Sequence, residues 1–214
     1  MTTRAANEDL PRRRIRLSPE KRQAMILEIT AKLVSDEGVS AVTMDRVGRE
    51  AGISKSLVYN YFPNLSDLLK ATLERELRVL RGGQAVAARE AETFEGLVRG
   101  VTKVYLNYIQ DRGLIIERLQ AEPSLSAVSD PTQYGREGAV HALAMIVAKQ
   151  FSLPMPIASA VTDISFGIPA AAGAFLLHGD LPAEKVEELT VQMILGSIKG
   201  VVEHELISER GLRD

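Results

Sequence analysis

The stretch AGISKSLVYNYFPN, residues 51–64, gathers hydroxyl, amide and aromatic side chains just before a proline. Ser54 can cap a helix, and Phe62 lies next to the proline, which biases it away from helical dihedral angles. The stretch therefore predicts a helix from Lys55 to about Phe62. Residues four apart share a helix face, and Val58 with Phe62 forms the one purely apolar column.

With that column packed inward, a polar edge points outward, made of Lys55, Ser56, Tyr59 and Asn60. Upstream, Thr43 caps a second predicted helix that runs to about Glu50, and Gly52 can take the positive φ of a tight turn. Two short helices joined by such a turn are typical of a DNA-binding helix-turn-helix, whose second helix lies in the major groove. Hydroxyl, amide and apolar side chains suit the donors, acceptors and thymine methyl groups of that groove. On spacing alone, an ordinary helix pair with a core and a solvated surface is the alternative.

Helix signals flank this pair on both sides. Ser18 caps a predicted first helix that ends at Gly38. Asn64 caps a fourth helix that continues to Gly82 and Gly83, which weaken it. Alternating β-branched runs bounded by hairpin turns are missing from the sequence, so the predicted fold class is all-α. Apolar periodicity predicts further helices over residues 94–110, 114–120, 132–151, 157–177 and 183–207.

Composition argues against several kinds of site. The 214 residues are 45% hydrophobic and 25% charged, which is ordinary for a globular protein. The sequence has no cysteine, which excludes disulfides and thiolate chemistry. Its three histidines, His141, His178 and His204, lack the close spacing of metal ligands. We therefore expect no metal and no cofactor.

The longest uncharged run late in the chain, residues 164–177, is shorter than the roughly 20 residues that cross a membrane. We interpret it as a buried helix of a soluble protein, kinked at Pro169. The N-terminal segment is charged and lacks the apolar core of a secretory signal. These features predict a cytoplasmic protein that does not bind membranes.

Charge is unevenly distributed along the chain. Residues 1–70 hold 12 lysines and arginines against 9 acidic residues, whereas residues 71–214 hold 14 against 19. The basic excess is concentrated in RRRIR, residues 12–16. We predict a flexible basic arm over residues 1–17, which is hypothesised to enter the minor groove of DNA; a solvated tail is the alternative.

The segment ILEITAKLVSDEGVSAVTMDRVGREAGISKSLVYNYFPNLSDLLKATL resembles the N-terminal domain of the TetR family of bacterial transcriptional regulators. The resemblance implies a helix-turn-helix DNA-binding domain over residues 18–70 and a larger helical domain for effector binding and dimerisation over residues 71–214. It further implies a homodimer on double-stranded DNA, bound to a palindromic operator and released by a small-molecule effector. We predict a repressor; an activator is the alternative, because both use the same DNA-binding surface. The last two helices, over 157–177 and 183–207, would form the dimer interface.

Individual contacts follow from the same match. Phosphate contacts are implied for Thr43, Lys55, Tyr59 and Tyr61, and base or backbone contacts for Ser54, Ser56 and Asn60. Leu57 departs from the family pattern, which has a small or polar residue there; it touches a thymine methyl or belongs to the core. Leu65 stands where the family often has a phosphate-binding lysine. We expect weaker nonspecific affinity, or compensation by Lys70 or the basic arm.

The larger domain offers candidates for an effector pocket, which needs mostly apolar walls with a few polar groups. The candidates are Tyr105, Ile109, Arg118, Tyr134, His141, Met145 and Phe166. For each of them an ordinary place in the core or in a surface pair is the alternative.

Enzymatic motifs are missing from the sequence: there is no nucleophile elbow, no phosphate-binding P-loop, no dinucleotide-binding glycine pattern and no cysteine nucleophile. We therefore predict that the protein is not an enzyme. A helical enzyme without such motifs, or a protein-interaction module with an incidental helix-turn-helix, is the alternative.

Overall fold

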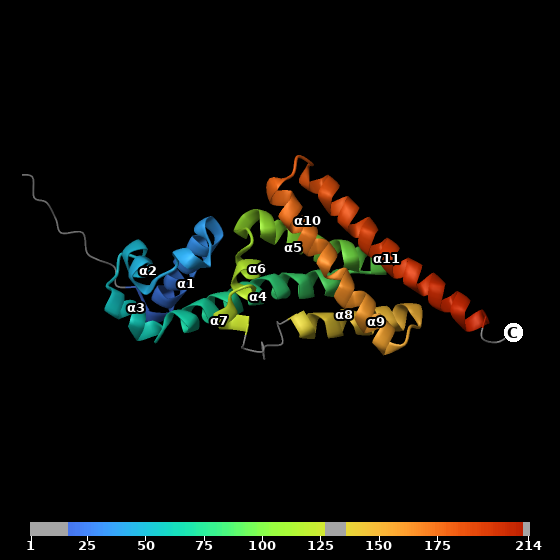
Figure 1. The fold of residues 1–214 in the computed structure, drawn as a ribbon, viewed down its shortest axis with the longest axis horizontal. Helices are drawn as coiled ribbons and strands as arrows, with labels where there is room; N and C mark the ends of the chain where they lie inside the picture. The colour runs from blue at the N-terminus through green and yellow to red at the C-terminus, as the bar shows by residue number, and fades with distance from the viewer. Residues whose placement is uncertain (1–16, 127–135, 212–214) are drawn as a thin grey trace, which may run out of the picture.

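The computed structural model describes residues 17–126 and 136–211, and within these ranges every regular element is helical, which confirms the predicted all-α fold class. Figure 1 shows α1, α2 and α3 at one end of the molecule, α8 to α11 at the other, and α4 running between them. The elements in chain order are α1 (Pro19–Glu37), the 3-10 helix η1 (Val39–Ala41), α2 (Met44–Glu50), α3 (Lys55–Tyr61), α4 (Leu65–Glu90), α5 (Phe94–Arg112), α6 (Ile115–Gln120), α7 (Pro123–Ser126), α8 (Arg136–Phe151), α9 (Met155–Ser165), α10 (Gly167–His178) and α11 (Ala183–Gly211).

The first four α-helices begin at side-chain caps, as predicted. The cap oxygen of each accepts a hydrogen bond from the backbone N–H three residues later, at distances from 2.8 to 3.3 Å. Each such cap stabilises a helix by about 0.5–2 kcal/mol. The four caps are Ser18, Thr43, Ser54 and Asn64. These helices share one apolar core that includes Ile26, Val34, Val47, Val58, Phe62 and Leu68.

The angle between α2 and α3 depends on two glycines. Gly52 has a φ of 63°, the left-handed region that the turn requires. Gly48 lies buried in α2, where an added Cβ would sit 3.1 Å from the carbonyl oxygen of Ile53 and 3.3 Å from the amide nitrogen of Lys55. The backbone of the turn therefore approaches α2 as closely as it does because residue 48 has no side chain.

Helix α4 passes unbroken through Gly82 and Gly83 to Glu90, although the sequence predicted a weakening there. Two glycines cost only about 2 kcal/mol of helix propensity. Gly83 offsets part of that cost by letting α4 and α5 pack closely, because a Cβ there would lie only 3.0 Å from the side chain of Val104. On either side of the glycines the helix is held by tertiary contacts, so tertiary packing outweighs local propensity.

The predicted single buried helix over residues 157–177 is instead two helices, α9 and α10, which meet at Phe166. Pro169 has no N–H to donate to a carbonyl four residues earlier, so the break falls one turn before it. The prediction of burial is also wrong. In α10 only Gly173 is buried, and Phe175 is 46% exposed. At the end of α9, Ile164 is 77% exposed.

By length and composition, Met155–His178 passes as one stretch that could cross a membrane, with 22% of its most apolar window buried. Even so, α10 packs on both α5 and α11, as expected for part of a helical domain. A Cβ on Gly173 would come within 3.1 Å of Ile109 and 3.2 Å of Tyr105, so α10 lies close against α5.

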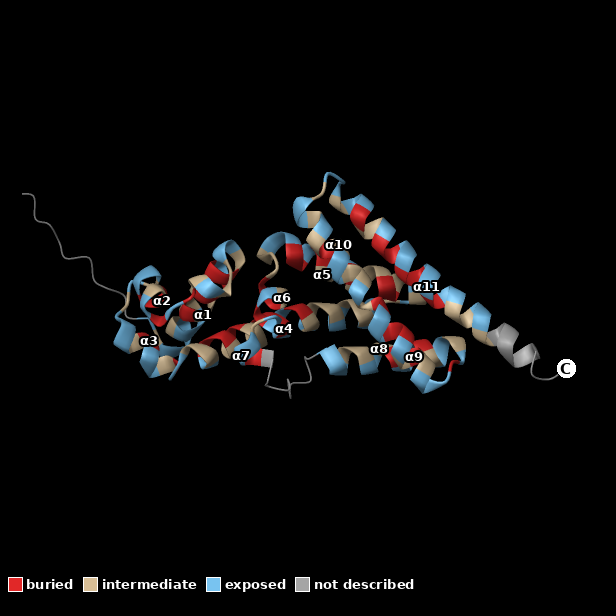
Figure 2. Ribbon diagram, in the orientation of Figure 1, coloured by how far each residue is buried: buried red, intermediate tan, exposed pale blue. Residues whose placement is uncertain are grey.

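The sides of α10 and α11 turned away from the core form what we call the outer face (Figure 2). On α11, Gly196 and Gly200 add to it, since a Cβ on either would meet nothing within 4 Å. The exposed large apolar side chains of the outer face are Phe175, Leu177, Leu189 and Met193, together with Leu181 in the loop that joins the two helices.

Candidate nucleic-acid interface and internal cavity

Helix α3 presents the polar edge that the four-residue spacing predicts. Val58 is fully buried and Phe62 is 4% exposed, so this column fixes the helix on the core. The opposite side chains, Lys55, Ser56, Tyr59 and Asn60, are all exposed. Leu57 and Tyr61 are half-buried at the border between the two sides, and Tyr61 packs against the core. The helix thus has a rigid base and an accessible polar side.

Capping occupies two of the predicted contact residues. The hydroxyl oxygens of Thr43 and Ser54 accept from backbone N–H groups, and the Ser54 and Ser56 hydroxyls lie 3.0 Å apart in a hydrogen bond. Within the described residues, the side chains of Lys55, Tyr59 and Asn60 make no hydrogen bond. Lys55, Tyr59 and Asn60 are therefore the side chains of α3 that are available to a partner.

Lys70 and the basic arm are the two candidates for replacing the phosphate contact that Leu65 cannot make. Leu65 packs against the apolar core, and Lys70 is half-buried in α4. The basic arm, including its RRRIR run at residues 12–16, lies outside the described residues.

An ionic network ties α1 to α4 and α5. Arg112 of α5 donates to Glu28 of α1, with N–O distances of 2.6 and 3.2 Å, and to Glu76 of α4, at 2.8 and 3.2 Å. Arg75 also pairs with Glu28, and Tyr108 donates to Glu76 at 2.9 Å. Because Glu76 is only 1% exposed, its charge depends on these partners.

The network also shifts proton affinities. Hydrogen bonds from Arg112, and then from Arg75, lower the pKa of Glu28 from 4.5 to about 2. Burial, together with the neighbouring charge of Glu76, raises the pKa of Tyr108 well above its ordinary value. At neutral pH the carboxylate of Glu28 is therefore charged and the phenol of Tyr108 is neutral, which is the state in which all these bonds form.

A second link joins α6 to the end of α1. The guanidinium group of Arg118 donates to the carbonyl oxygens of Val34, at 2.7 Å, and Ser35, at 2.5 Å. Both carbonyls belong to the last turn of α1, where a helix runs out of N–H groups of its own, although that of Val34 also accepts from the N–H of Gly38 at 3.0 Å. Helix α1 is thus held to α4, α5 and α6 by charged side chains.

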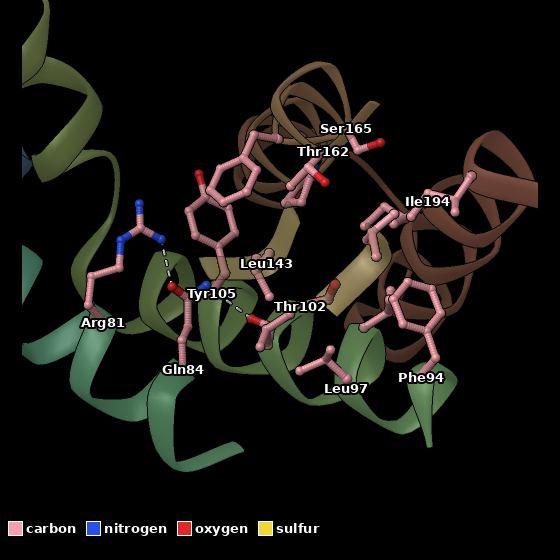
Figure 3. Close-up of a pocket in the computed structure, with 16 residues that line it drawn as sticks. Arg81, Gln84, Phe94, Leu97, Thr102, Tyr105, Leu143, Thr162, Ser165 and Ile194 are labelled. Atoms are coloured by element: carbon pink, nitrogen blue, oxygen red, sulfur yellow. Dashed lines mark hydrogen bonds between the residues drawn. The ribbon is translucent and has the colours of Figure 1, made fainter. Parts of the chain in front are cut away.

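A cavity of about 100 Å³ lies between α4, α5, α8, α9, α10 and α11. Figure 3 shows Arg81 and Gln84 at one end and Phe94 and Ile194 at the other. The lining is otherwise mostly aliphatic, with Leu97, Val98, Val101, Leu143, Val147, Pro169 and Ile198, and it also includes Thr102, Tyr105, Thr162, Ser165 and Phe166.

Charged groups gather at the Arg81 end of the cavity. Arg81 donates to Gln84 at 2.6 Å, and its guanidinium carbon lies 5.8 Å from the centre of the Phe166 ring. Arg136 lies 5.3 Å from the same ring and pairs with Asp163. Burial lowers the pKa of Arg81; the neighbouring Tyr105 and Glu117 act in the opposite direction, and the positive charge of Arg136 lowers it further.

Two threonines that line the cavity have unsatisfied hydroxyl groups. Thr102 is 2% exposed and Thr162 is 5% exposed, and neither Oγ1 has a hydrogen-bond partner among the described residues. A buried polar atom without a partner costs about 1–3 kcal/mol. By contrast, the buried hydroxyl of Thr190 donates to the carbonyl oxygen of Val186 at 2.6 Å.

Comparison with known proteins relates this arrangement to a family. The family model for bacterial regulatory proteins of the tetR family matches residues 26–72. The transcriptional activator FasR of Mycolicibacterium smegmatis is 25% identical over 197 residues, which cover 89% of each chain. Residues 26–72 thus form a TetR-family domain.

Solved structures share the fold over most of the chain. A TetR-like regulator from Rhodococcus sp. RHA1 has a TM-score of 0.71 and 18% identity, with 86% of this chain and 100% of that chain covered. LfrR of Mycobacterium smegmatis, solved in complex with proflavine, has a TM-score of 0.61 and 16% identity over 84% of this chain and 98% of its own. At these identities the likeness concerns the fold.

Of the predicted pocket residues, Tyr105 and Phe166 line the cavity. Ile109 is fully buried in the core beside it, where it packs with Leu77 and Leu80. Three others do not belong to the cavity lining. Arg118 binds the end of α1, His141 is exposed on α8, and Met145 is 50% exposed on the same helix. Tyr134 lies outside the described residues.

The misplacements on α8 have a physical cause. Apolar periodicity is weak there, so the sequence does not indicate which side of the helix faces inward. The lining residues that sequence reasoning missed include Arg81, Gln84, Thr102 and Thr162. A signal for Thr102 was present: it interrupts the buried stripe of Val98, Leu106 and Ile109 with a hydroxyl group.

Proposed function

We propose that this TetR-family transcriptional regulator binds a palindromic operator through α3, with Lys55, Tyr59 and Asn60 as its principal contacts. The observation that carries the proposal is the exposed polar edge of α3 on a fixed apolar base. Lys55 and Tyr59 would contact phosphates, as would Thr43 and Tyr61, and these contacts position the protein. Base contacts would come from Asn60, with Ser54, Ser56 and Leu57 beside it.

We propose a homodimer joined through the outer face of α10 and α11. The exposed side chains of Phe175, Leu189 and Met193 support this arrangement, because large apolar side chains exposed on two helices that pack together are expected to meet a partner. Gly196 and Gly200 would let the two copies of α11 approach closely. A two-fold axis through this interface would set the spacing of the two operator half-sites.

The protein would act in the cytoplasm as a repressor. A dimer that occupies promoter DNA needs no further contact to block transcription, whereas an activator also needs a productive contact with the polymerase. The relative FasR is named as an activator, so the sign of regulation has to be measured by transcription in vitro from a template that carries the operator.

The internal cavity would bind a small-molecule effector that releases the DNA. Support comes from α4, which contributes Arg81 and Gln84 to the cavity and Leu68 to the core beneath α3. Thirteen residues of helix separate Leu68 from Arg81, about 20 Å. An effector that shifts α4 would therefore move α3 and change the half-site spacing, provided that it binds the shifted state more tightly.

Selection of bound duplexes from a random-sequence pool tests the DNA proposal. Wild-type protein and Tyr59→Ala would be selected in parallel at two salt concentrations. The proposal predicts a palindrome for the wild type and its loss in the variant. Binding that is sequence-blind and responds only to salt would contradict it.

A further inference from the structure

We propose that Glu28 of α1 is a positioning residue, whose ion pairs with Arg112 and Arg75 fix the orientation of the DNA-binding helices α1, α2 and α3 on the rest of the subunit. The inference deepens the proposed function and rests on it only where the readout is operator binding. Three features carry it: the anchoring of Arg112, the geometry of its pair with Glu28, and the place of Glu28 along α1.

Arg112 is a fixed docking point for α1. Its Nε and Nη2 atoms donate to the two carboxylate oxygens of Glu76 of α4, at 3.2 and 2.8 Å. Glu76 is 1% exposed, and it also accepts a hydrogen bond from the hydroxyl of Tyr108 at 2.9 Å. Two parallel hydrogen bonds to one carboxylate hold a guanidinium group in a defined plane. The cation that Glu28 meets is therefore held in place by α4 and α5.

The pair between Glu28 and Arg112 is directional. The Nη1 and Nη2 atoms of Arg112 donate to Oε1 and Oε2 of Glu28, at 2.6 and 3.2 Å, and Arg75 of α4 also donates to Oε2. Apolar packing joins α1 to its neighbours as well, since the core that contains Ile26 of α1 also contains Ile115 of α6. The hydrophobic effect is non-directional, whereas a forked ion pair requires one relative orientation of its two helices. Core packing therefore keeps α1 in contact with its neighbours, and Glu28 selects the angle.

Glu28 lies near the middle of α1, at a distance from the other charged attachment of this helix. That attachment is Arg118 of α6, which binds the carbonyl groups of Val34 and Ser35 in the last turn. The helical rise places the two attachments about 10 Å apart along α1. A helix held at two points resists pivoting, whereas a helix held at one end does not. Without Glu28, α1 would pivot about its C-terminal end and carry α3 with it, because both helices share one core.

Alanine substitutions separate orientation from folding. The Glu28 side chain is 47% exposed and alanine favours a helix, so Glu28→Ala should lower the melting temperature by less than about 6 °C. Glu28→Gln keeps one acceptor oxygen and should have an intermediate effect on orientation. The matched control is Asp36→Ala, which makes the same change in charge on the same helix. It removes an ion pair between Asp36 and Lys32, both of α1, and so loosens no contact between helices.

Double electron–electron resonance on the full-length protein measures the orientation directly. The chain has no cysteine, so Asp45→Cys on α2 and Lys103→Cys on α5, both at exposed positions, each take one spin label. Labelled subunits are mixed with an excess of unlabelled ones, so that each measured distance lies within one subunit. Glu28→Ala is expected to broaden the distance distribution, and Asp36→Ala is expected to leave it at the wild-type width. A distribution that Glu28→Ala leaves unchanged would overturn the proposal, because apolar packing would then fix the angle alone.

Operator spacing separates this inference from the proposed function. A half-exposed ion pair contributes up to about 5-fold to an equilibrium, and a dimer has two copies. Discrimination against an operator with one inserted base pair should therefore fall by about 3- to 25-fold in Glu28→Ala, with unchanged affinity for an isolated half-site. Equal discrimination by both proteins, or a weaker half-site affinity in Glu28→Ala, would overturn the role of Glu28 on DNA. A wild type that binds no operator would overturn the proposed function, while the distance measurement still decides whether Glu28 sets the orientation.

Discussion

Replacing Arg112 by methionine removes the cation at the centre of the ionic network between α1, α4 and α5. Methionine keeps much of the packing volume of the arginine stem but donates no hydrogen bonds. Glu76 then retains the hydroxyl of Tyr108, 2.9 Å away, and loses two bonds from a cation at a site that is 1% exposed. The variant is expected to be strongly destabilised.

The size of the loss follows from the cost of leaving a buried charge unpaired. Removing one partner of a buried ion pair costs about 3–5 kcal/mol. We expect Arg112→Met to lose about 3–4 kcal/mol at pH 7, in the lower part of this range, because Tyr108 still donates to Glu76.

Urea unfolding at fixed protein concentration measures this loss, since the proposed dimer would make stability depend on concentration. The double variant Glu76→Gln with Arg112→Met removes both members of the ion pair and should recover most of the loss. A loss below about 1 kcal/mol, or a double variant no more stable than Arg112→Met, would refute the reasoning that the buried Glu76 depends on its ion pair with Arg112.

Three further predictions concern other parts of the molecule. Gly48→Ala should cost about 1–3 kcal/mol by urea unfolding and weaken DNA binding, because its Cβ would press on the carbonyl of Ile53. Stability contributed by Glu28 should be present above pH 4.5 and lost towards its folded pKa of about 2, and acid titration of Glu28→Gln should lack this part of the loss. Met193→Asp on the outer face should yield monomers in sedimentation experiments, and an intact dimer would exclude that face as the interface.

Helix α3 was predictable because the residues that fix its ends and its buried side lie within one short stretch of sequence. A capping serine, a proline and one apolar column within residues 51–64 fix the start, the end and the inward side of α3, and Val58 and Phe62 are buried accordingly. Phe62 itself lies just past the helix end rather than in its last turn, since the proline removes helical geometry one residue earlier than predicted.

The cavity was less predictable because its walls come from six helices. Which side of α8 faces the cavity depends on helices far away in sequence, so His141 and Met145 could not be placed from periodicity. The role of Arg118 could not be predicted for the same reason, because the carbonyl groups that it binds lie 83 and 84 residues earlier in the chain. The apolar run in α10 was read as buried because sequence alone does not say whether its partner is the same chain or another copy.

The central claim is that α3 reads DNA sequence, and the most direct measurement compares Asn60→Ala with Asn107→Ala, an exposed asparagine on α5. For each protein, the affinity for the selected operator would be divided by the affinity for a scrambled duplex at one salt concentration. The account predicts that Asn60→Ala lowers this ratio by about 10-fold, consistent with about 1–3 kcal/mol for a base contact, while Asn107→Ala leaves it unchanged. An unchanged ratio for Asn60→Ala, with the operator still bound, would contradict the assignment of this side chain to base recognition.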